Sequence, residues 1–171
     1  MKKKINLVAE IGCNHKGDFD IAKEMIEKLV FFCNVNFIKF QKRDNKKLLT
    51  KKEYNAPHPN PENSYGKTYG DHREYLEFSF DQHQKLFNYC KKLKAEYSSS
   101  AWDINSAKLL AKLKIKHIKI PSACNLDFEM INYLCKNFKG KIHISLGMTK
   151  KSEEKKIFNL IKKNGRTKDL I

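Results

Sequence analysis

The chain has 171 residues, 40% of them hydrophobic and 11% aromatic, a composition that suits one packed domain and excludes a disordered chain. No apolar run approaches the roughly 20 residues that a membrane span requires, so we expect no membrane-embedded part. The formal net charge of +16 comes from lysines scattered along the whole chain, with only three arginines; this favours solvated helix surfaces and leaves a basic nucleic-acid-binding module as a remote alternative.

The N-terminal segment does not have the pattern of a secretion signal. The basic Met1–Lys4 is followed by an apolar run, 5–11, that is too short for a signal peptide and has no small-residue cleavage site after it. The five cysteines are an odd number and contain no Cys-x-x-Cys pair, which argues against a disulfide framework or a structural zinc site. We therefore expect a cytoplasmic protein with reduced, mostly buried cysteines.

Strands and helices are predicted to alternate along the chain. Apolar runs predict strands at about 5–11, 36–41, 96–100, 115–120 and 141–146, and 168–171 has the pattern of the first residues of a sixth. Apolar residues at three- and four-residue spacing predict helices at about 21–30 (capped by Asp18), 79–93, 104–113, 126–138 and 151–163. Strict alternation of this kind predicts a parallel sheet wrapped by helices.

Two architectures share this alternation, the doubly wound sheet and the (β/α)8 TIM-type barrel. The sequence has neither a Gly-x-Gly-x-x-Gly nor a Gly-Lys-Ser/Thr phosphate loop, which weakens the nucleotide-binding version of the doubly wound sheet. Every predicted strand ends in residues capable of chemistry, as barrels require: Glu10, Lys39, Gln41, 98–100, Lys119, Ser122 and Ser145. We predict an incomplete α/β barrel of about five βα units plus the start of a sixth strand, because a full barrel takes about 250 residues.

One predicted connection, at about 42–78, is unusually long. Connections of this length inside compact domains are usually lids, binding loops or disordered segments. In a barrel it would follow a strand and lie on the active-site face. Its Tyr65, Tyr69, His72 and Arg73 are not typical linker residues, which favours an active-site loop over a variable insertion without chemistry.

Two lysines lie inside predicted strands, where an unpaired ammonium costs several kcal/mol. Lys39 lies between Ile38 and Phe40, and strand alternation places its side chain on the face opposite to theirs. Together with Lys119 and several serine hydroxyls it would form a site for phosphate or carboxylate oxygens. Glu10 would add a carboxylate suited to acid/base chemistry, or it could form a structural ion pair with one of the lysines.

Four short motifs occur in a fixed order along the chain. They are Ala-Glu-Ile-Gly-x-Asn-His-x-Gly-Asp at 9–18, Ile-Lys-Phe-Gln at 38–41, Ile-Lys-Ile-x-Ser at 118–122 and Ser-x-Gly-Met at 145–148. In order and approximate spacing they resemble the N-acetylneuraminate (sialic acid) synthase family. Related bacterial members make legionaminic or pseudaminic acid, and the motifs do not separate these products. The resemblance covers nearly the whole chain, which it identifies as a partial synthase barrel over residues 1–171.

The resemblance implies a phosphoenolpyruvate (PEP)-dependent condensation with an N-acylated sugar, N-acetylmannosamine or a relative, to give a nonulosonic acid and phosphate. A divalent metal, usually Mn²⁺ in this family, would polarise the sugar aldehyde. Carbon 3 of PEP would attack that aldehyde, water would add at carbon 2, and phosphate would leave.

The same resemblance implies roles for residues at matching positions. Glu10 matches the acid/base carboxylate, and Gln41 matches a residue on the sugar side. The residues implied in PEP binding are Lys39, Ser100, Lys119, Ser122 and Ser145. The family position of Ser100 is usually threonine, and Ser99 could take its place. Asn14 and His15 belong to a motif near the pocket and are candidate pocket residues.

Two parts of the family pattern are missing. The metal-binding histidines of the family lie on later strands, beyond Ile171, and the C-terminal antifreeze-like domain, which reaches across a homodimer, is also absent. We therefore expect no metal ligand here, and either a fragment, a barrel completed by a second polypeptide, or a truncated non-catalytic remnant. His143 shares strand parity with Ser145, but a single strand histidine is more often a hydrogen-bonded core residue than a ligand.

Overall fold

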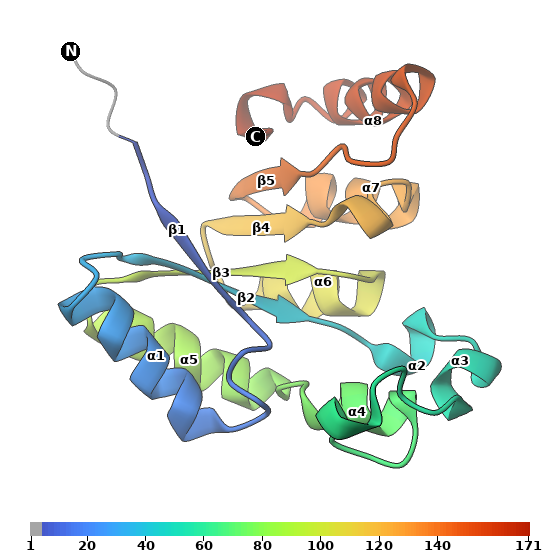
Figure 1. Cartoon of the computed structure of the whole chain (residues 1–171). Coiled ribbons are helices and arrows are strands. Elements are labelled where there is room, and N and C mark those ends of the chain that lie inside the picture. Colours follow the sequence, from blue (N-terminus) through green and yellow to red (C-terminus); the bar gives the residue numbers. More distant parts are fainter. Residues whose placement is uncertain (1–4) are drawn as a thin grey trace.

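A computed structural model, which describes residues 5–171, contains one parallel sheet in the order β1-β2-β3-β4-β5 (Figure 1). The strands are β1 (Val8–Gly12), β2 (Phe37–Lys42), β3 (Glu96–Ala101), β4 (His117–Ile120) and β5 (Lys141–Ile144). A doubly wound sheet would reverse its strand order, whereas here each strand pairs only with its neighbours in the sequence. The predicted partial (β/α)8 barrel is confirmed. Met1–Lys4, used above to argue against a secretion signal, lies outside the described residues.

The predicted helices follow the strands. They are α1 (Phe19–Phe31), α5 (Phe80–Lys92), α6 (Ile104–Lys112), α7 (Phe128–Asn137) and α8 (Lys151–Lys163). Asp18 caps α1, since its carboxylate accepts hydrogen bonds from the backbone N–H groups of Asp20 and Ile21 at 2.8 and 3.0 Å. Across residues 5–171, no helix combines the length and the apolar character needed to cross a membrane.

The two faces of the sheet have opposite chemistry. The side chains that point toward the helices are apolar and buried, among them Ile38, Phe40, Tyr97, Ile118, Ile120 and Ile142. Alternate residues of the same strands point to the other face, which becomes the barrel interior. That face carries polar groups, including Lys39 and Lys119. The hydrophobic core therefore lies between sheet and helices, and the interior is left for a polar site.

The first predicted strand and the start of the sixth are both shorter than predicted. The first strand begins at Val8 instead of Ile5, because its pairing with β2 starts at Val8 and Phe37; Ile5 is 92% exposed. At the other end, Thr167–Asp169 forms a 3₁₀ turn. Only after that turn does Leu170 pair in parallel with Ile142 of β5, so the start of a sixth strand is present but begins later than predicted.

The long connection contains helices that were not predicted. Its helices α2 (Asn45–Leu48), α3 (Lys51–Asn55) and α4 (Tyr69–Tyr75) lie together beyond the carboxyl end of β2 (Figure 1). Capping boxes start two of them, with Thr50 and Glu53 at α3 and Thr68 and Asp71 at α4. This Thr-x-x-acid pattern is visible in the sequence and was the available signal.

Arg166, two residues beyond the cap of α8, connects α7 to β5. Its guanidinium donates hydrogen bonds to the carbonyl oxygens of Cys135 and Gly140, each at 2.8 Å, and to that of Phe138. Its Nε also donates to the Asp169 carboxylate at 2.8 Å. A single side chain therefore satisfies carbonyl groups at the end of α7 and before β5.

Replacing Arg166 by methionine should lower the free energy of unfolding by about 2–4 kcal/mol, because several part-buried carbonyl groups lose their donor. Urea unfolding followed by circular dichroism measures this change. Lys163→Met is the control, since it removes an exposed charge with no recorded hydrogen bond and should change stability by less than about 0.5 kcal/mol. Equal effects of the two substitutions would contradict the assignment.

Candidate active site

Lys39 is the centre of the polar interior. Its residue is only 9% exposed, and its Nζ forms an ion pair with the Glu10 carboxylate and donates to Ser100 Oγ at 3.2 Å. The sheet brings the three together, because Glu10 pairs with Lys39 across β1 and β2, and Ser100 lies on β3 next to β2. The structural ion pair considered above is therefore present. The Glu10 side chain is still 45% exposed, so its carboxylate remains accessible for acid/base chemistry.

Both lysines line one cavity of about 300 Å³ on the interior face. The other polar residues at its wall are Ser98, His143 and Ser145, and the apolar ones are Val8, Phe37, Ile144 and Ile171. Two ammonium groups and nearby hydroxyls provide donors suited to carboxylate and phosphate oxygens. The predicted grouping of Lys39, Lys119 and Ser145 around one space is what the structure shows.

The charge of Lys39 is sensitive to its surroundings. Burial, and then the positive charge of Lys119, lower the pKa of Lys39 to about 8. The Glu10 carboxylate acts in the opposite sense, because an adjacent negative charge favours the ammonium form. The pKa of Lys39 therefore lies well below that of an exposed lysine.

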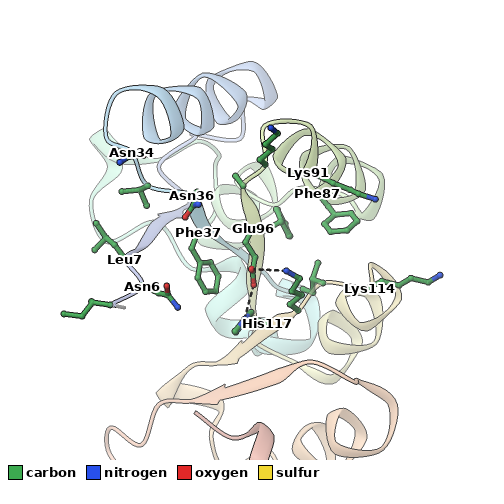
Figure 2. Close-up of a pocket in the computed structure, with 17 residues that line it drawn as sticks. Asn6, Leu7, Asn34, Asn36, Phe37, Phe87, Lys91, Glu96, Lys114 and His117 are labelled. Atoms are coloured by element: carbon green, nitrogen blue, oxygen red, sulfur yellow. Dashed lines mark hydrogen bonds and ion pairs between the residues drawn. The ribbon is translucent and has the colours of Figure 1, made fainter. Parts of the chain in front are cut away.

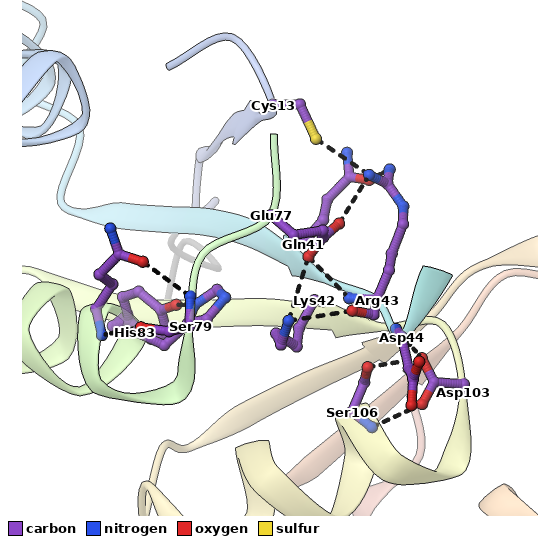
Figure 3. A network of polar contacts seen from close by, with 12 residues as sticks. Cys13, Gln41, Lys42, Arg43, Asp44, Glu77, Ser79, His83, Asp103 and Ser106 are labelled. Atoms are coloured by element: carbon purple, nitrogen blue, oxygen red, sulfur yellow. Dashed lines mark hydrogen bonds and ion pairs between the residues drawn. The ribbon is translucent and has the colours of Figure 1, made fainter. Parts of the chain in front are cut away.

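Gln41 is held by a network that was not predicted. Arg43 donates to Gln41 Oε1, to Glu77 Oε1 at 3.2 Å and to Cys13 Sγ at 3.1 Å, as Figure 3 shows. The Arg43 guanidinium also lies over the Trp102 ring, 4.6 Å from its centroid. Because Arg43 occupies the amide oxygen of Gln41, the amide N–H₂ is the group that remains to face a ligand.

The long connection is tied to the rim of this site at both ends. At its start, the backbone N–H of Asp44 donates to the Asp103 carboxylate at 2.8 Å. At its end, Glu77 pairs with both Arg43 and Lys42. Burial raises the pKa of Glu77 against the opposing effect of these two cations. The predicted active-site loop is thus attached directly beside Gln41.

Ser122 and Ser145 lie in the segments that follow β4 and β5, and Asn125 joins these segments. The buried amide N–H₂ of Asn125 donates to the carbonyl oxygens of Ser145 at 2.9 Å and Gly147 at 3.2 Å. Ser122 packs on Gly147 so closely that an added Cβ there would lie 3.3 Å from the Ser122 Cβ. No sequence signal distinguished Asn125, because its partners are backbone groups twenty or more residues away.

Four further candidate residues can now be placed in the structure. Ser100 faces Lys39, whereas Ser99 is fully buried on the helix side, so Ser100 is the better placed of the two. His15 is buried and stacks on Phe78 with ring centroids 4.0 Å apart, and burial lowers its pKa to about 4. Asn14 is exposed in the adjacent turn. Within residues 5–171, the residues that line the interior cavity include neither Asn14 nor His15, and Glu10, Gln41, Ser100 and Ser122 are not among them either. The pocket roles of these six residues therefore remain predictions.

Two other features concern possible ligands. A larger hollow of about 830 Å³ lies at the amino ends of the strands, opposite to the motif residues, and we place the site at the carboxyl ends, where barrel chemistry occurs. Over the described part of the chain, no three His, Cys, Asp or Glu side chains are grouped so as to hold a metal ion. The donors present therefore do not fit a resident divalent ion.

Comparison with known proteins agrees with the motifs. The family model described as "NeuB family" matches residues 25–171. The chain is 35% identical to N-acetylneuraminate-9-phosphate synthase of Drosophila melanogaster over 95% of this chain and 43% of that protein. It is 31% identical to N,N'-diacetyllegionaminic acid synthase of Campylobacter jejuni over 95% of this chain and 48% of that protein.

A solved structure shares the fold. The N-acetylneuraminic acid (sialic acid) synthetase of Leptospira borgpetersenii superposes with a TM-score of 0.74 at 19% identity, covering 92% of this chain and 50% of that one. The chain therefore spans about half the length of the proteins it matches.

Replacing Glu10 by glutamine should move the pKa of Lys39 further below about 8, because the negative charge that favours the ammonium is lost. NMR titration of lysine side-chain carbons, with Lys39 assigned through Lys39→Met, measures the shift. Glu24→Gln is the matched control, since Glu24 pairs only with the exposed Lys28 at 4.0 Å. An unchanged Lys39 pKa in Glu10→Gln would show that the ion pair is not formed in solution.

Proposed function

This chain belongs to the NeuB family, and we propose that it takes part in a sialic-acid-type synthase reaction that condenses PEP with an N-acylated sugar. The observation that supports this most is the convergence of Lys39 and Lys119 on one interior cavity beside Ser145. PEP carries a carboxylate and a phosphate, and two separate ammonium groups match those two anions.

We assign roles from the family resemblance and, for Lys39, Lys119 and Ser145, from the cavity that they share. Lys39 and Lys119 bind the carboxylate and phosphate of PEP, and Ser100, Ser122 and Ser145 donate hydrogen bonds to its oxygens. Glu10, half exposed beside Lys39, moves protons at the reacting sugar end. Gln41, whose amide oxygen is held by Arg43, presents its N–H₂ to the sugar.

Holding PEP in place reduces the entropic cost of bringing it to the sugar. The buried setting of Lys39 also strengthens its attraction for an anion, because little water competes. The expectation of Mn²⁺ rests on the family resemblance alone, and the described residues perform no step through it. Those residues bind and orient PEP and exchange protons with the reactants.

The identity of the sugar, a homodimer, a cytoplasmic location and turnover by the whole protein all belong to this proposal, since the chain spans only 43–48% of the sequence relatives described above. A non-catalytic remnant is the second candidate. PEP binding without phosphate release, in the length of protein that its cells produce, would identify that candidate.

Isothermal titration calorimetry with PEP should detect binding that Lys119→Met weakens by about 10–100-fold, the effect of losing one charge-assisted hydrogen bond. Affinity should also fall as pH rises through about 8, because Lys39 loses its positive charge there. Lys116→Met is the control: Lys116 is exposed at the amino-terminal end of β4 and pairs only with Glu96. Equal weakening by both substitutions, or no binding at any pH, would contradict the proposed function.

A further inference from the structure

Three polar side chains on successive strands form a series of close polar contacts inside the barrel. Glu96 of β3 contacts His117 of β4, with 3.0 Å between Glu96 Oε1 and His117 Nε2. His117 in turn contacts His143 of β5, with 2.7 Å between His117 Nδ1 and His143 Nε2. Figure 2 shows Glu96 and His117 at the amino-terminal hollow (Figure 2).

The series Glu96–His117–His143 crosses the interior from one side to the other. Its first two members line the hollow of about 830 Å³ at the amino ends of the strands. Its last member, His143, lines the cavity that also holds Lys39 and Lys119, and it is the direct pairing partner of Lys119 across β4 and β5. The contacts therefore link solvent at the amino-terminal hollow to the cavity assigned to PEP.

These contacts favour one arrangement of protons on the two rings. A Glu96 carboxylate oxygen 3.0 Å from His117 Nε2 favours the tautomer that carries its hydrogen on that nitrogen. The neutral ring then has a bare Nδ1, which accepts the Nε2–H of His143. That leaves His143 Nδ1 with a free lone pair, and no protein partner for it is recorded over residues 5–171.

Burial, with help from neighbouring cations, keeps both rings neutral near pH 7. Burial, followed by His117, Lys119 and Lys39, lowers the pKa of His143. Burial also lowers the pKa of His117, with Lys116 and Lys141 acting in the same sense and Glu96 in the opposite one. A bare, neutral His143 Nδ1 beside two ammonium groups is a proton acceptor within an anion site.

We propose that His143 is a further proton-transfer residue of this cavity, positioned by His117 and Glu96. This role rests on the proposed PEP reaction. As a water oxygen bonds to carbon 2 of PEP, His143 Nδ1 takes one proton from that water. It gives this proton to the departing phosphate oxygen when the bond between that oxygen and carbon 2 breaks. The second water proton goes to the oxyanion left on the former aldehyde, and carbon 2 keeps the water oxygen as its carbonyl oxygen.

The first test reads protons directly, in the length of protein that its cells produce. Long-range ¹H–¹⁵N NMR, assigned with His143→Gln and His117→Phe, should show His143 as the Nε2–H tautomer. Adding PEP should raise the His143 pKa by about one unit or more, since a bound anion favours the imidazolium. Glu129→Gln, an exposed substitution on α7, is the control and should leave both observations unchanged. An Nδ1–H tautomer would overturn the proposal.

The second test uses rates. His143→Gln should lower kcat by about 10²-fold, at the low end of effects for acid–base groups. Glu96→Gln should move the acidic limb of the pH profile of kcat to lower pH. The protonated form of the His117–His143 pair then loses its negative neighbour, which lowers the pKa of these histidines. Glu129→Gln, an exposed glutamate on α7, is the control. A merely structural role would lower stability without moving that limb.

The outcomes separate the two ideas. If PEP does not bind, both the proposed function and the proton-transfer role of His143 are contradicted. If PEP binds while the pKa of His143 and the pH profile of Glu96→Gln stay unchanged, only the role of His143 falls.

Discussion

The burial of the Lys39 ammonium is the constraint on which the site depends. Removing this charge from water costs several kcal/mol, and the recorded compensation comes from one carboxylate, Glu10, and one hydroxyl, Ser100. Each partner comes from a different neighbouring strand. The pairing of β1, β2 and β3 must therefore be correct before the charge can be accommodated. The register of these strands thus also determines which polar groups meet in the cavity.

The composition of the barrel interior points to function rather than to stability. Barrel interiors are usually filled by branched apolar side chains. Here the same face carries Lys39, Ser98, Lys119 and His143 beside the apolar Val8, Phe37 and Ile144, while the fully buried apolar residues of these strands point to the helices. The fold can accommodate a polar interior, because the isoleucine-rich face of the sheet that packs on the helices supplies most of the buried apolar surface. Groups with shifted pKa values gathered in one cavity are typical of sites that bind or transform a ligand.

The alternation of strands with helices, together with the polar strand ends, predicted the architecture. The two-residue period within a strand predicted the inward direction of Lys39 and Lys119. Contacts across the long connection could not be predicted, because the position of Glu77 beside Arg43 depends on how α2 to α4 fold back. The contact between His117 and His143 also needed coordinates: the two residues are not paired in register, and only the stagger of neighbouring strands brings them together. His15 shows the reverse case, in which a motif residue supports the turn by packing on Phe78.

The pairing of each strand with its immediate neighbours in sequence has a consequence for biosynthesis. Domains begin to fold from the N-terminus while the ribosome is still adding residues. A sheet ordered β1-β2-β3-β4-β5 can grow by one strand at a time, since each new strand finds its partner already made. The step from β2 to β3 closes the longest loop, but the entropic cost of closure rises only with the logarithm of loop length. The growing edge is then always the most recent strand, which is the part of the nascent sheet that chaperones would have to shield.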